Sequence, residues 1–411
     1  MNRVVITGMG AITPLGNTVS EYWDGIKNGK NGITAITKFD ASETGVSVAG
    51  EVKDFEATLY MDRKEYKRMD LFSQYAVAAS AQAVEQSGID MEKIDADRFG
   101  VTIGSGVGGF ITMESGIIKM HEKGPKRVPP MFVPMAIGNM AAGNTAIKFG
   151  AKGPSMDIVT ACASATNSIG EAFRSIKHGY ADLMLAGGAE ATVCEIGIAG
   201  FAALTALSTS TDPDRASIPF DKERNGFVMG EGAGILMLEN LDHALERGAN
   251  ILAEVVGYGV TCDAYHMTAP SADGSGAGKA MLQAMKEAGI TPAQVDYINA
   301  HGTSTAANDS GETAAIKYAF GEEAYNVAIS STKSMTGHLL GAAGGIEAVA
   351  CVKAIQDDFM PPTIGFQVAD EGCDLDYIPN VGREKEVTYT LSNSLGFGGH
   401  NAVLCFKKWE A

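Results

Sequence analysis

The sequence has little positive charge for its length, no paired cysteines and no long apolar run. Its 411 residues carry 49 acidic side chains against 32 lysines and arginines, and the net charge of −17 excludes a general nucleic-acid-binding surface. Six cysteines lie apart without a CxxC motif, which excludes a zinc framework or a disulfide scaffold and favours a reducing compartment. No run of about 18 apolar residues and no signal-peptide pattern occurs, so we expect a cytoplasmic protein without a membrane span.

What the sequence does contain is a regular alternation of short β-branched runs and helical patterns of small residues. Strands are expected over residues 4–7, 99–103, 155–160, 182–186, 235–238, 251–258, 295–300, 327–331, 387–391 and 402–406. Helices are expected over residues 18–27, 71–86, 165–178, 278–288, 311–319 and 339–355. This alternation predicts the α/β class with a largely buried sheet.

Two segments, one in each half of the chain, have a similar order of features. TACASATNSIGEA at residues 160–172 and TGHLLGAAGGIEA at 336–348 each place a reactive side chain in a turn before a helix of small residues. The similarity favours an internal duplication. The alternative is a likeness of composition alone, because helices rich in glycine and alanine resemble one another.

Cys162 has the strongest local signal for chemistry. It stands between an expected strand and an expected helix, where the helix dipole and free backbone N–H groups favour a thiolate and can stabilise an oxyanion. The turn therefore predicts a reactive thiol. The alternative is a buried cysteine that acts as a small apolar residue, which is what we expect of the other five.

Two histidines stand at similar turns in the second half of the chain. His301 follows an expected strand and His338 precedes an expected helix, where open α/β sheets place their ligand sites. Lys333 is expected to orient or polarise His338, with a chance match to the serine-acylase SxxK pattern or an ordinary surface lysine as alternatives. Glu347 lies on a helix of small and apolar residues, so we expect a buried lysine or cation beside it.

Two glycine-rich loops each allow two interpretations. GSGVGG at residues 104–109 matches the dinucleotide-binding pattern GxGxxG, but no second strand with an acidic end follows. Close backbone packing or a pocket wall, with Val107 facing inward, is therefore favoured. LGFGGHN at residues 395–401 is either a turn between two closing strands or a mobile loop in which Phe397 is an apolar gate.

Basic residues gather in two places despite the acidic character of the whole chain. The first cluster is Arg63, Lys64, Lys67 and Arg68, and the second is Lys119, Lys123, Lys126 and Arg127. A single cluster of this kind is usually a solvated face. Two clusters against a charge of −17 predict a docking patch for an anionic partner.

Taken together, the motifs resemble those of the β-ketoacyl-ACP synthases, and most closely the type II elongating enzymes of bacterial fatty acid synthesis. The resemblance covers the whole chain and is carried by Thr160-Ala-Cys162-Ala-Ser164, His301-Gly-Thr303-Ser-Thr305, Lys333-Ser-Met-Thr-Gly-His338 and Gly396-Phe397-Gly-Gly-His400-Asn401. It implies a thiolase-like fold in five αβαβα layers, and usually a homodimer. Residues 1–250 would form the half with the cysteine and residues 251–411 the half with the two histidines.

The resemblance also implies a reaction and the residues that perform it. The reaction is a decarboxylative Claisen condensation of malonyl-ACP with an acyl chain on Cys162, and it requires no cofactor. The implied catalytic residues are the nucleophile Cys162, the decarboxylation and condensation pair His301 and His338, the supporting Lys333 and Glu347, and the gatekeeper Phe397 beside the oxyanion hole. Substrate contacts are implied at Val107, Phe201, Thr303, Thr305 and Gly398, with the two threonines holding the phosphopantetheine arm.

Two further sites follow from the same resemblance. Docking of acyl-ACP and malonyl-ACP is implied at Lys64, Lys67, Arg68, Lys126 and Arg127. A structural monovalent or divalent cation site is implied at Asn299, Glu347, Ser392 and Asn393. The chain departs from the family pattern at Ala306, where a proline is common, and at Thr205, where relatives often carry a docking arginine.

Two alternative functions can be distinguished from a condensing enzyme. A biosynthetic thiolase would use acyl-CoA and a second cysteine near the C-terminus, where this chain has Gly398–His400. A non-catalytic scaffold that binds acyl chains for a carrier protein would have no use for a highly reactive Cys162.

Overall fold

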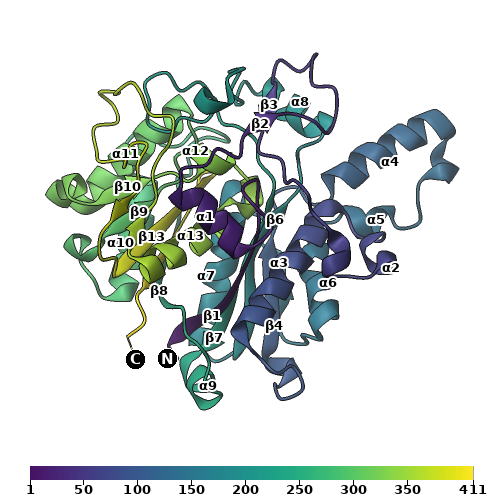
Figure 1. Ribbon diagram of the computed structural model, residues 1–411, viewed down its shortest axis with the longest axis horizontal. Helices are drawn as coiled ribbons and strands as arrows, with labels where there is room; N and C mark the ends of the chain where they lie inside the picture. Colours follow the sequence, from purple (N-terminus) through teal and green to yellow (C-terminus); the bar gives the residue numbers. More distant parts are fainter. Residues whose placement is uncertain (411) are drawn as a thin grey trace.

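The computed structural model describes residues 1–410 and has one ten-stranded mixed sheet covered by helices (Figure 1). The strands, in their order across the sheet, are β10 (Ala328–Ser330), β9 (Tyr297–Asn299), β13 (Tyr389–Gly396), β14 (His400–Lys407), β8 (Ala253–Cys262), β1 (Val4–Ile12), β7 (Gly232–Asn240), β6 (Leu183–Glu190), β4 (Phe99–Gly104) and β5 (Ser155–Met156). Two short pairs lie outside it: β2 (Thr34–Ala35) with β3 (Val48–Ala49), and β11 (Phe359–Met360) with β12 (Arg383–Glu384).

The sheet consists of two halves with the same strand order. If the strands of each half are numbered along the chain, both halves read third, second, fourth, fifth, first. The directions also agree, since β4 and β9 pair in parallel with both neighbours, while β6–β7–β1 and β13–β14–β8 are antiparallel. The halves join where Val4–Ile6 of β1 pairs with Ala253–Val255 of β8.

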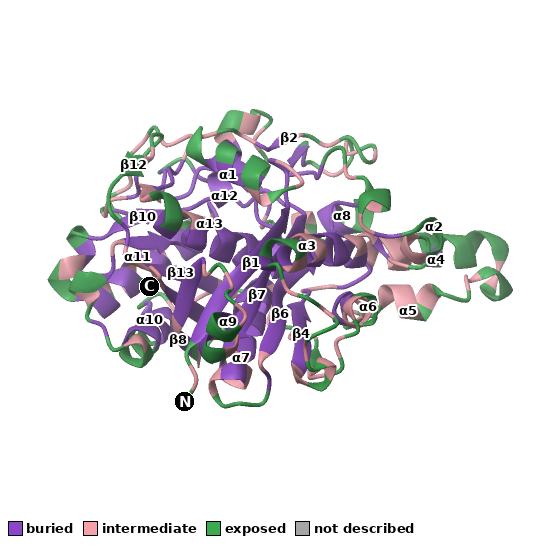
Figure 2. Ribbon diagram, turned by 60° about the horizontal axis from the view of Figure 1, so that its bottom comes forward, coloured by how far each residue is buried: buried purple, intermediate pink, exposed green. Residues whose placement is uncertain are grey.

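Helices form three layers around the two halves of the sheet. The helices that pack on the sheet are α3 (Leu71–Ser87) and α6 (Met140–Phe149) outside the first half, α7 (Ser164–Lys177) and α13 (Ala343–Asp357) between the halves, and α10 (Ser275–Ala288) with α11 (Ala306–Phe320) outside the second. The remaining helices are α1 (Val19–Lys27), α2 (Arg63–Tyr66), α4 (Phe110–Lys123), α5 (Phe132–Ala136), α8 (Glu195–Ala203), α9 (Leu241–Glu246) and α12 (Lys333–Thr336). The expected α/β class and the αβαβα order of layers are confirmed, and the central helices and strands are buried (Figure 2).

Local sequence explains how closely these layers pack. On α7, Ile169, Ala172, Phe173 and Ile176 recur at helical spacing and are buried, and Gly179 follows with a φ of +80°. On β1, a Cβ atom at Gly10 would lie 1.8 Å from the carbonyl oxygen of Ala79 on α3. Glycine is therefore required there for the first helix layer to contact the sheet.

The structure corrects several expected elements. The strand expected at 155–160 is limited to Ser155–Met156, because β5 is the sheet edge and pairs with β4 over two residues only. The helix expected at 311–319 begins at Ala306, and seven helices were not expected: α2, α4, α5, α6, α8, α9 and α12. Among residues 1–410, no helix combines the length and the apolar character that crossing a membrane requires.

Candidate active site

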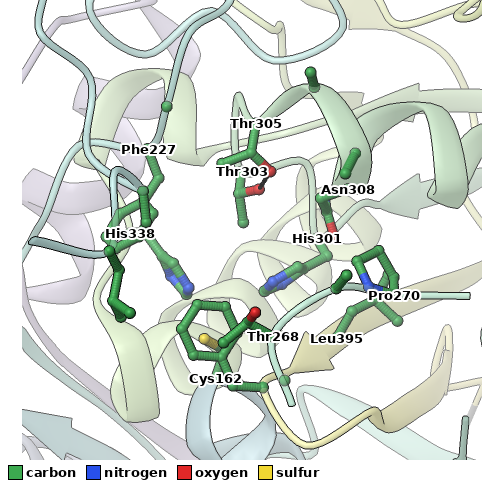
Figure 3. A pocket seen from close by; sticks show the side chains of 18 of the residues that line it. Cys162, Phe227, Thr268, Pro270, His301, Thr303, Thr305, Asn308, His338 and Leu395 are labelled. Carbon is green, nitrogen blue, oxygen red and sulfur yellow. Dashed lines mark hydrogen bonds between the residues drawn. The ribbon is translucent and has the colours of Figure 1, made fainter. Parts of the chain in front are cut away.

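Three side chains from distant parts of the chain meet at the inner end of one cavity (Figure 3). Cys162 lies in the 3₁₀ turn η4 (Ala161–Ala163) before α7, His301 follows β9, and His338 precedes the 3₁₀ turn η8 (Leu340–Ala342) and α13. The Cys162 sulfur and a nitrogen of each imidazole ring lie within 4.8 Å of one another. The structure thus brings together the three residues for which the sequence predicts chemistry.

The repeated topology explains this meeting. α7 follows the third strand of the first half and α13 follows the third strand of the second, so Cys162 and His338 precede equivalent helices of the central layer. Gly396, at the end of β13, packs against the turn that contains Cys162. A Cβ atom at Gly396 would lie 2.5 Å from the carbonyl oxygen of Thr160 and 3.4 Å from the backbone nitrogen of Cys162.

The Cys162 thiol is protonated in the resting site, contrary to the thiolate that the turn predicts. The side chain is 9% exposed, and this burial raises the pKa of Cys162 to about 12. The charge of Lys333 and the backbone N–H of Phe397 lower the pKa, but burial outweighs them. Cys162 therefore needs a base beside it in order to act as a nucleophile.

Both histidines are neutral and have free ring nitrogens. Burial, followed by the charge of Lys333, lowers the pKa of His301 and of His338 well below the usual value. The rings are 5.2 Å apart and nearly perpendicular. Within residues 1–410, Nδ1 of His301 and both ring nitrogens of His338 have no hydrogen-bond partner, so they are available to a substrate or to the thiol proton.

Lys333 and Glu347 form a buried ion pair behind the histidines. Nζ of Lys333 donates to Oε1 of Glu347, and both side chains are almost fully buried. Burial raises the pKa of Glu347, and the neighbouring ammonium group opposes that rise. This is the buried lysine partner that the sequence predicts for Glu347, and the interpretation of Lys333 as a surface lysine is wrong.

The cavity above Cys162 has a volume of about 410 Å³ and a largely apolar wall. Phe201, Phe397, Thr303 and Thr305 line it, and the hydroxyls of the two threonines lie 2.9 Å apart. Val107 and Gly398 were expected to contact substrate but are not among the residues that line the described cavity. Cys162 is the one cysteine among the lining residues from the described chain, so a second thiol of the thiolase kind is not present in this cavity.

The loop at residues 396–400, for which a gate is one of the two sequence interpretations, has an unusual backbone conformation. Gly398 and Gly399 have φ values of +88° and +75°, which other residues adopt only with strain. The half-buried Phe397 ring lies 6.5 Å from the Phe201 ring, and Phe201 in turn contacts Phe227, which packs edge-on against His338. Aromatic contacts thereby link the Phe397 ring to His338.

A buried carboxylate that the sequence interpretation missed holds the loop of His301. Glu312 on α11 accepts hydrogen bonds from the backbone N–H groups of His301 and Gly302, at 2.8 and 2.7 Å. Burial raises the pKa of Glu312 to about 7, with these bonds and that from Asn393 opposing the rise. An acidic residue within a helix of small residues, the signal noted for Glu347, would have identified it.

Three of the four residues expected at a cation site have side chains in the layer of helices between the two halves of the sheet. Asn299 and Ser392 are register partners on β9 and β13, and both side chains are directed toward α13, which carries Glu347. Each of the three has an oxygen without a hydrogen-bond partner, and such oxygens fit a hard cation. The side chain of Asn393 lies on the opposite face of β13, where it donates to Glu312, so the structure does not bring it to this group.

Both basic clusters are exposed and lie at one end of the molecule. Lys64, Lys67 and Arg68 lie on and just after α2, and Lys126 and Arg127 follow α4, in the region where α2, α4 and α5 project together (Figures 1 and 2). Thr205 is exposed at the mouth of the cavity with a φ of +52°.

Comparison with known proteins gives consistent matches over the whole chain. The family described as "Beta-ketoacyl synthase, N-terminal domain" matches residues 1–244, and the corresponding C-terminal domain family matches residues 252–367. A 3-oxoacyl-[acyl-carrier-protein] synthase 2 of Synechocystis is 56% identical over 99% of this chain and 98% of its own, and one of Staphylococcus aureus is 54% identical over 100% and 99%.

Solved structures agree with these relatives. A type II PKS ketosynthase, bound to the hexaketide and in complex with its acyl-carrier protein, superposes with a TM-score of 0.93 at 38% identity, with both chains fully covered. A β-ketoacyl synthase of Burkholderia phymatum gives a TM-score of 0.92 at 36% identity, again with full coverage of both chains.

Proposed function

Because the chain belongs to the β-ketoacyl synthase family, we propose that it is an elongating 3-oxoacyl-ACP synthase, an acyltransferase of fatty acid synthesis. It condenses malonyl-ACP with an acyl chain held on Cys162 and lengthens that chain by two carbons. The observation that carries the proposal is the meeting of one thiol and two neutral imidazoles at the inner end of an apolar cavity.

The first half of the reaction moves an acyl chain from its carrier to Cys162. The thiol gives its proton to a neighbouring neutral imidazole, and its sulfur bonds to the acyl carbon as the bond from that carbon to the carrier sulfur breaks. The imidazole returns the proton to the departing carrier thiolate. The backbone N–H groups of Cys162 and Phe397 stabilise the oxyanion that forms between these events.

The second half forms the new carbon–carbon bond. Malonyl-ACP loses CO₂, and the resulting enolate is stabilised by N–H groups of His301 and His338. The enolate carbon attacks the acyl group, the bond to the Cys162 sulfur breaks, and the thiolate takes up one proton. Burial, together with the charge of Lys333, keeps both rings neutral, so that each can offer one N–H and one free nitrogen.

No metal or organic cofactor takes part in these steps. If a structural cation binds, the oxygens of Asn299, Ser392 and Glu347 would hold it behind Lys333, where it would stabilise the packing of α13 on the sheet. The thiol, the imidazoles and the ion pair would keep their roles.

We further propose that the enzyme is a homodimer of the cytoplasm. The edge strand β5 is exposed, and nearby apolar side chains on or beside α4 and α5 are exposed too, among them Ile117, Ile118, Val133 and Ile137. A second copy would cover this unpaired edge. A cytoplasmic location agrees with the six free cysteines.

The experiment that tests the function is an elongation assay with purified acyl carrier protein, malonyl-ACP and acyl-ACP primers of graded length. We expect a 3-oxoacyl-ACP two carbons longer than the primer and one CO₂ for each turnover. Acyl-CoA in place of acyl-ACP is the control that separates this activity from a thiolase. Binding of acyl-ACP without product would contradict the proposal and favour the scaffold.

A further inference from the structure

The loop that matches GxGxxG already contains a carboxyl group, and that group belongs to the protein. Glu190 at the end of β6 is fully buried. Its carboxylate accepts hydrogen bonds from the backbone N–H groups of Gly106, at 2.7 Å, and Val107, at 3.3 Å, and from the Ser105 hydroxyl, at 2.9 Å. Similar loops bind phosphate through such N–H groups, so Glu190 occupies the position that a nucleotide would need.

The same carboxylate reaches the second half of the molecule. Oε2 of Glu190 accepts a hydrogen bond from the backbone N–H of Gly341, at 2.9 Å. A Cβ atom at Gly341 would lie only 2.3 Å from the backbone nitrogen of Gly106, so the two backbones are in direct contact around Glu190. Glu190 thus ties the turn at residues 105–107 to the turn that follows His338.

The second turn forms part of the wall of the catalytic cavity. Leu340 immediately precedes Gly341, has a φ of +48°, and lines the cavity that contains Cys162 and His338. A non-glycine residue keeps this conformation only when the surrounding structure holds it. The hydrogen bond from Gly341 to Glu190 is a contact of that kind.

Glu190 is the acceptor in all four of its hydrogen bonds. Within residues 1–410 it has no lysine, arginine or histidine as an ion-pair partner. A carboxylate can accept all four. A glutamine offers one accepting oxygen and an NH₂ group, which would face donors where acceptors are needed. Aspartate would be one methylene too short to reach both turns.

We propose that Glu190 is a positioning residue that sets which acyl chains the cavity accepts. It fixes Leu340, and with it the cavity wall beside Cys162, against the turn at residues 105–107. The inference rests on the proposed condensing activity and concerns the substrate range of that same site.

The test compares acyl-ACP primers of graded length in the E190Q, S105A and L340A variants. We expect E190Q to change the ratio of kcat/KM between long and short primers by at least about tenfold, the scale on which pocket shape discriminates by chain size. S105A removes one bond to Glu190 and should change the ratio in the same direction but less. L340A alters the wall itself, and its effect should not add to that of E190Q, because Glu190 acts through Leu340.

Asp296→Asn is the matched control. Oδ2 of Asp296 accepts hydrogen bonds from two backbone N–H groups, of Thr388 and Tyr389, at the end of β9 that lies away from His301. D296N should leave the ratio of kcat/KM between long and short primers unchanged, even if it lowers the melting temperature as much as E190Q does.

An equal loss of kcat/KM for all primers in E190Q, or additive effects of E190Q and L340A, would overturn the proposal. If E190Q does not fold, the S105A ratio decides. Failure of the wild-type enzyme to elongate any primer would instead contradict the proposed function, so the two failures can be distinguished.

Discussion

Cys162 shares its type with five other cysteines but not its surroundings. Cys262 is exposed, whereas Cys194, Cys351, Cys373 and Cys405 are buried away from the histidines. We expect Cys162→Ala to abolish elongation and Cys262→Ala to leave it unchanged. Mass mapping after iodoacetamide treatment should find label on Cys162 and Cys262 only. Normal elongation by C162A, or failure of Cys162 to label at any pH, would contradict its assignment as the nucleophile.

The two histidines are expected to share one task, the stabilisation of the enolate. His301→Ala and His338→Ala should each lower malonyl-ACP decarboxylation by at least about 100-fold, the scale for the loss of one oxyanion donor. Release of CO₂ from labelled malonyl-ACP measures this step separately from condensation. Near-normal decarboxylation in both variants would refute the assignment.

Glu312 predicts a pH dependence of stability. Its pKa is raised from the usual 4.5 to about 7, so its contribution to stability is complete below pH 4.5 and is lost as the pH rises through 7. Glu312→Gln does not titrate, so the stability difference between wild type and E312Q should shrink by up to about 3 kcal/mol from pH 5 to pH 8. Urea unfolding of both proteins at pH 5 and at pH 8 measures this difference in the free energy of unfolding. The lowered pKa of His301 affects the stability of both proteins equally, so its effect cancels in the comparison. A stability difference that stays constant from pH 5 to pH 8 would contradict the prediction.

At the scale of elements, the loop of Phe397 combines a bulky ring with three adjacent glycines. The ring can close the site over an unloaded Cys162 and move aside for an acyl chain, which would prevent wasteful decarboxylation before loading. Phe397→Ala should therefore slow acyl transfer or release CO₂ from malonyl-ACP without primer, with little loss of stability because the ring is half-buried. Single-turnover acylation and primer-free CO₂ release measure the two effects.

A stiffened loop is the counterpart of that experiment. Gly398→Val places a β-branched residue at a φ of +88° and should lower turnover while Cys162 still reacts with small alkylating reagents. Normal acyl transfer, substrate order and primer-free decarboxylation in F397A would mean that the ring only fills space.

The same elements show what the sequence could and could not predict. α7 was predictable because its apolar residues recur at helical spacing up to a glycine, and the turns of Cys162, His301 and His338 were marked by small residues. The segment 157–160 has strand-like residues but does not continue the pairing of β5 with β4. The thiolate expected at Cys162 was wrong because burial, which depends on the whole fold, outweighs the local turn. Glu190 was missed because its partners are backbone N–H groups of loops distant in the sequence, whereas Glu312, an acidic residue within a helix of small residues, carried a signal like that of Glu347.

At the scale of the whole molecule, the repeated topology of the two halves explains why residues about 140 to 180 positions apart form one site. Each half contributes a central helix whose N-terminal turn reaches the same cavity, and each half alone lacks part of the group. Charged side chains, in contrast, are distributed unevenly over the molecule. The chain as a whole has a net charge of −17, while α2 and the end of α4 carry exposed lysines and arginines without ion-pair partners in residues 1–410.

This asymmetry predicts that carrier-protein docking is electrostatic and local. Reversing the charge of Lys64, Lys67 and Arg68 should raise KM for acyl-ACP while leaving alkylation of Cys162 unchanged, because these side chains lie on the surface outside the cavity. Added salt should raise the wild-type KM, since exposed charges are screened over about 8–10 Å at physiological ionic strength. Lys286→Glu, an exposed reversal on α10 at the other end of the molecule, is the matched control. A KM that neither salt nor the triple reversal changes, or that K286E raises equally, would mean that overall charge or another surface governs docking.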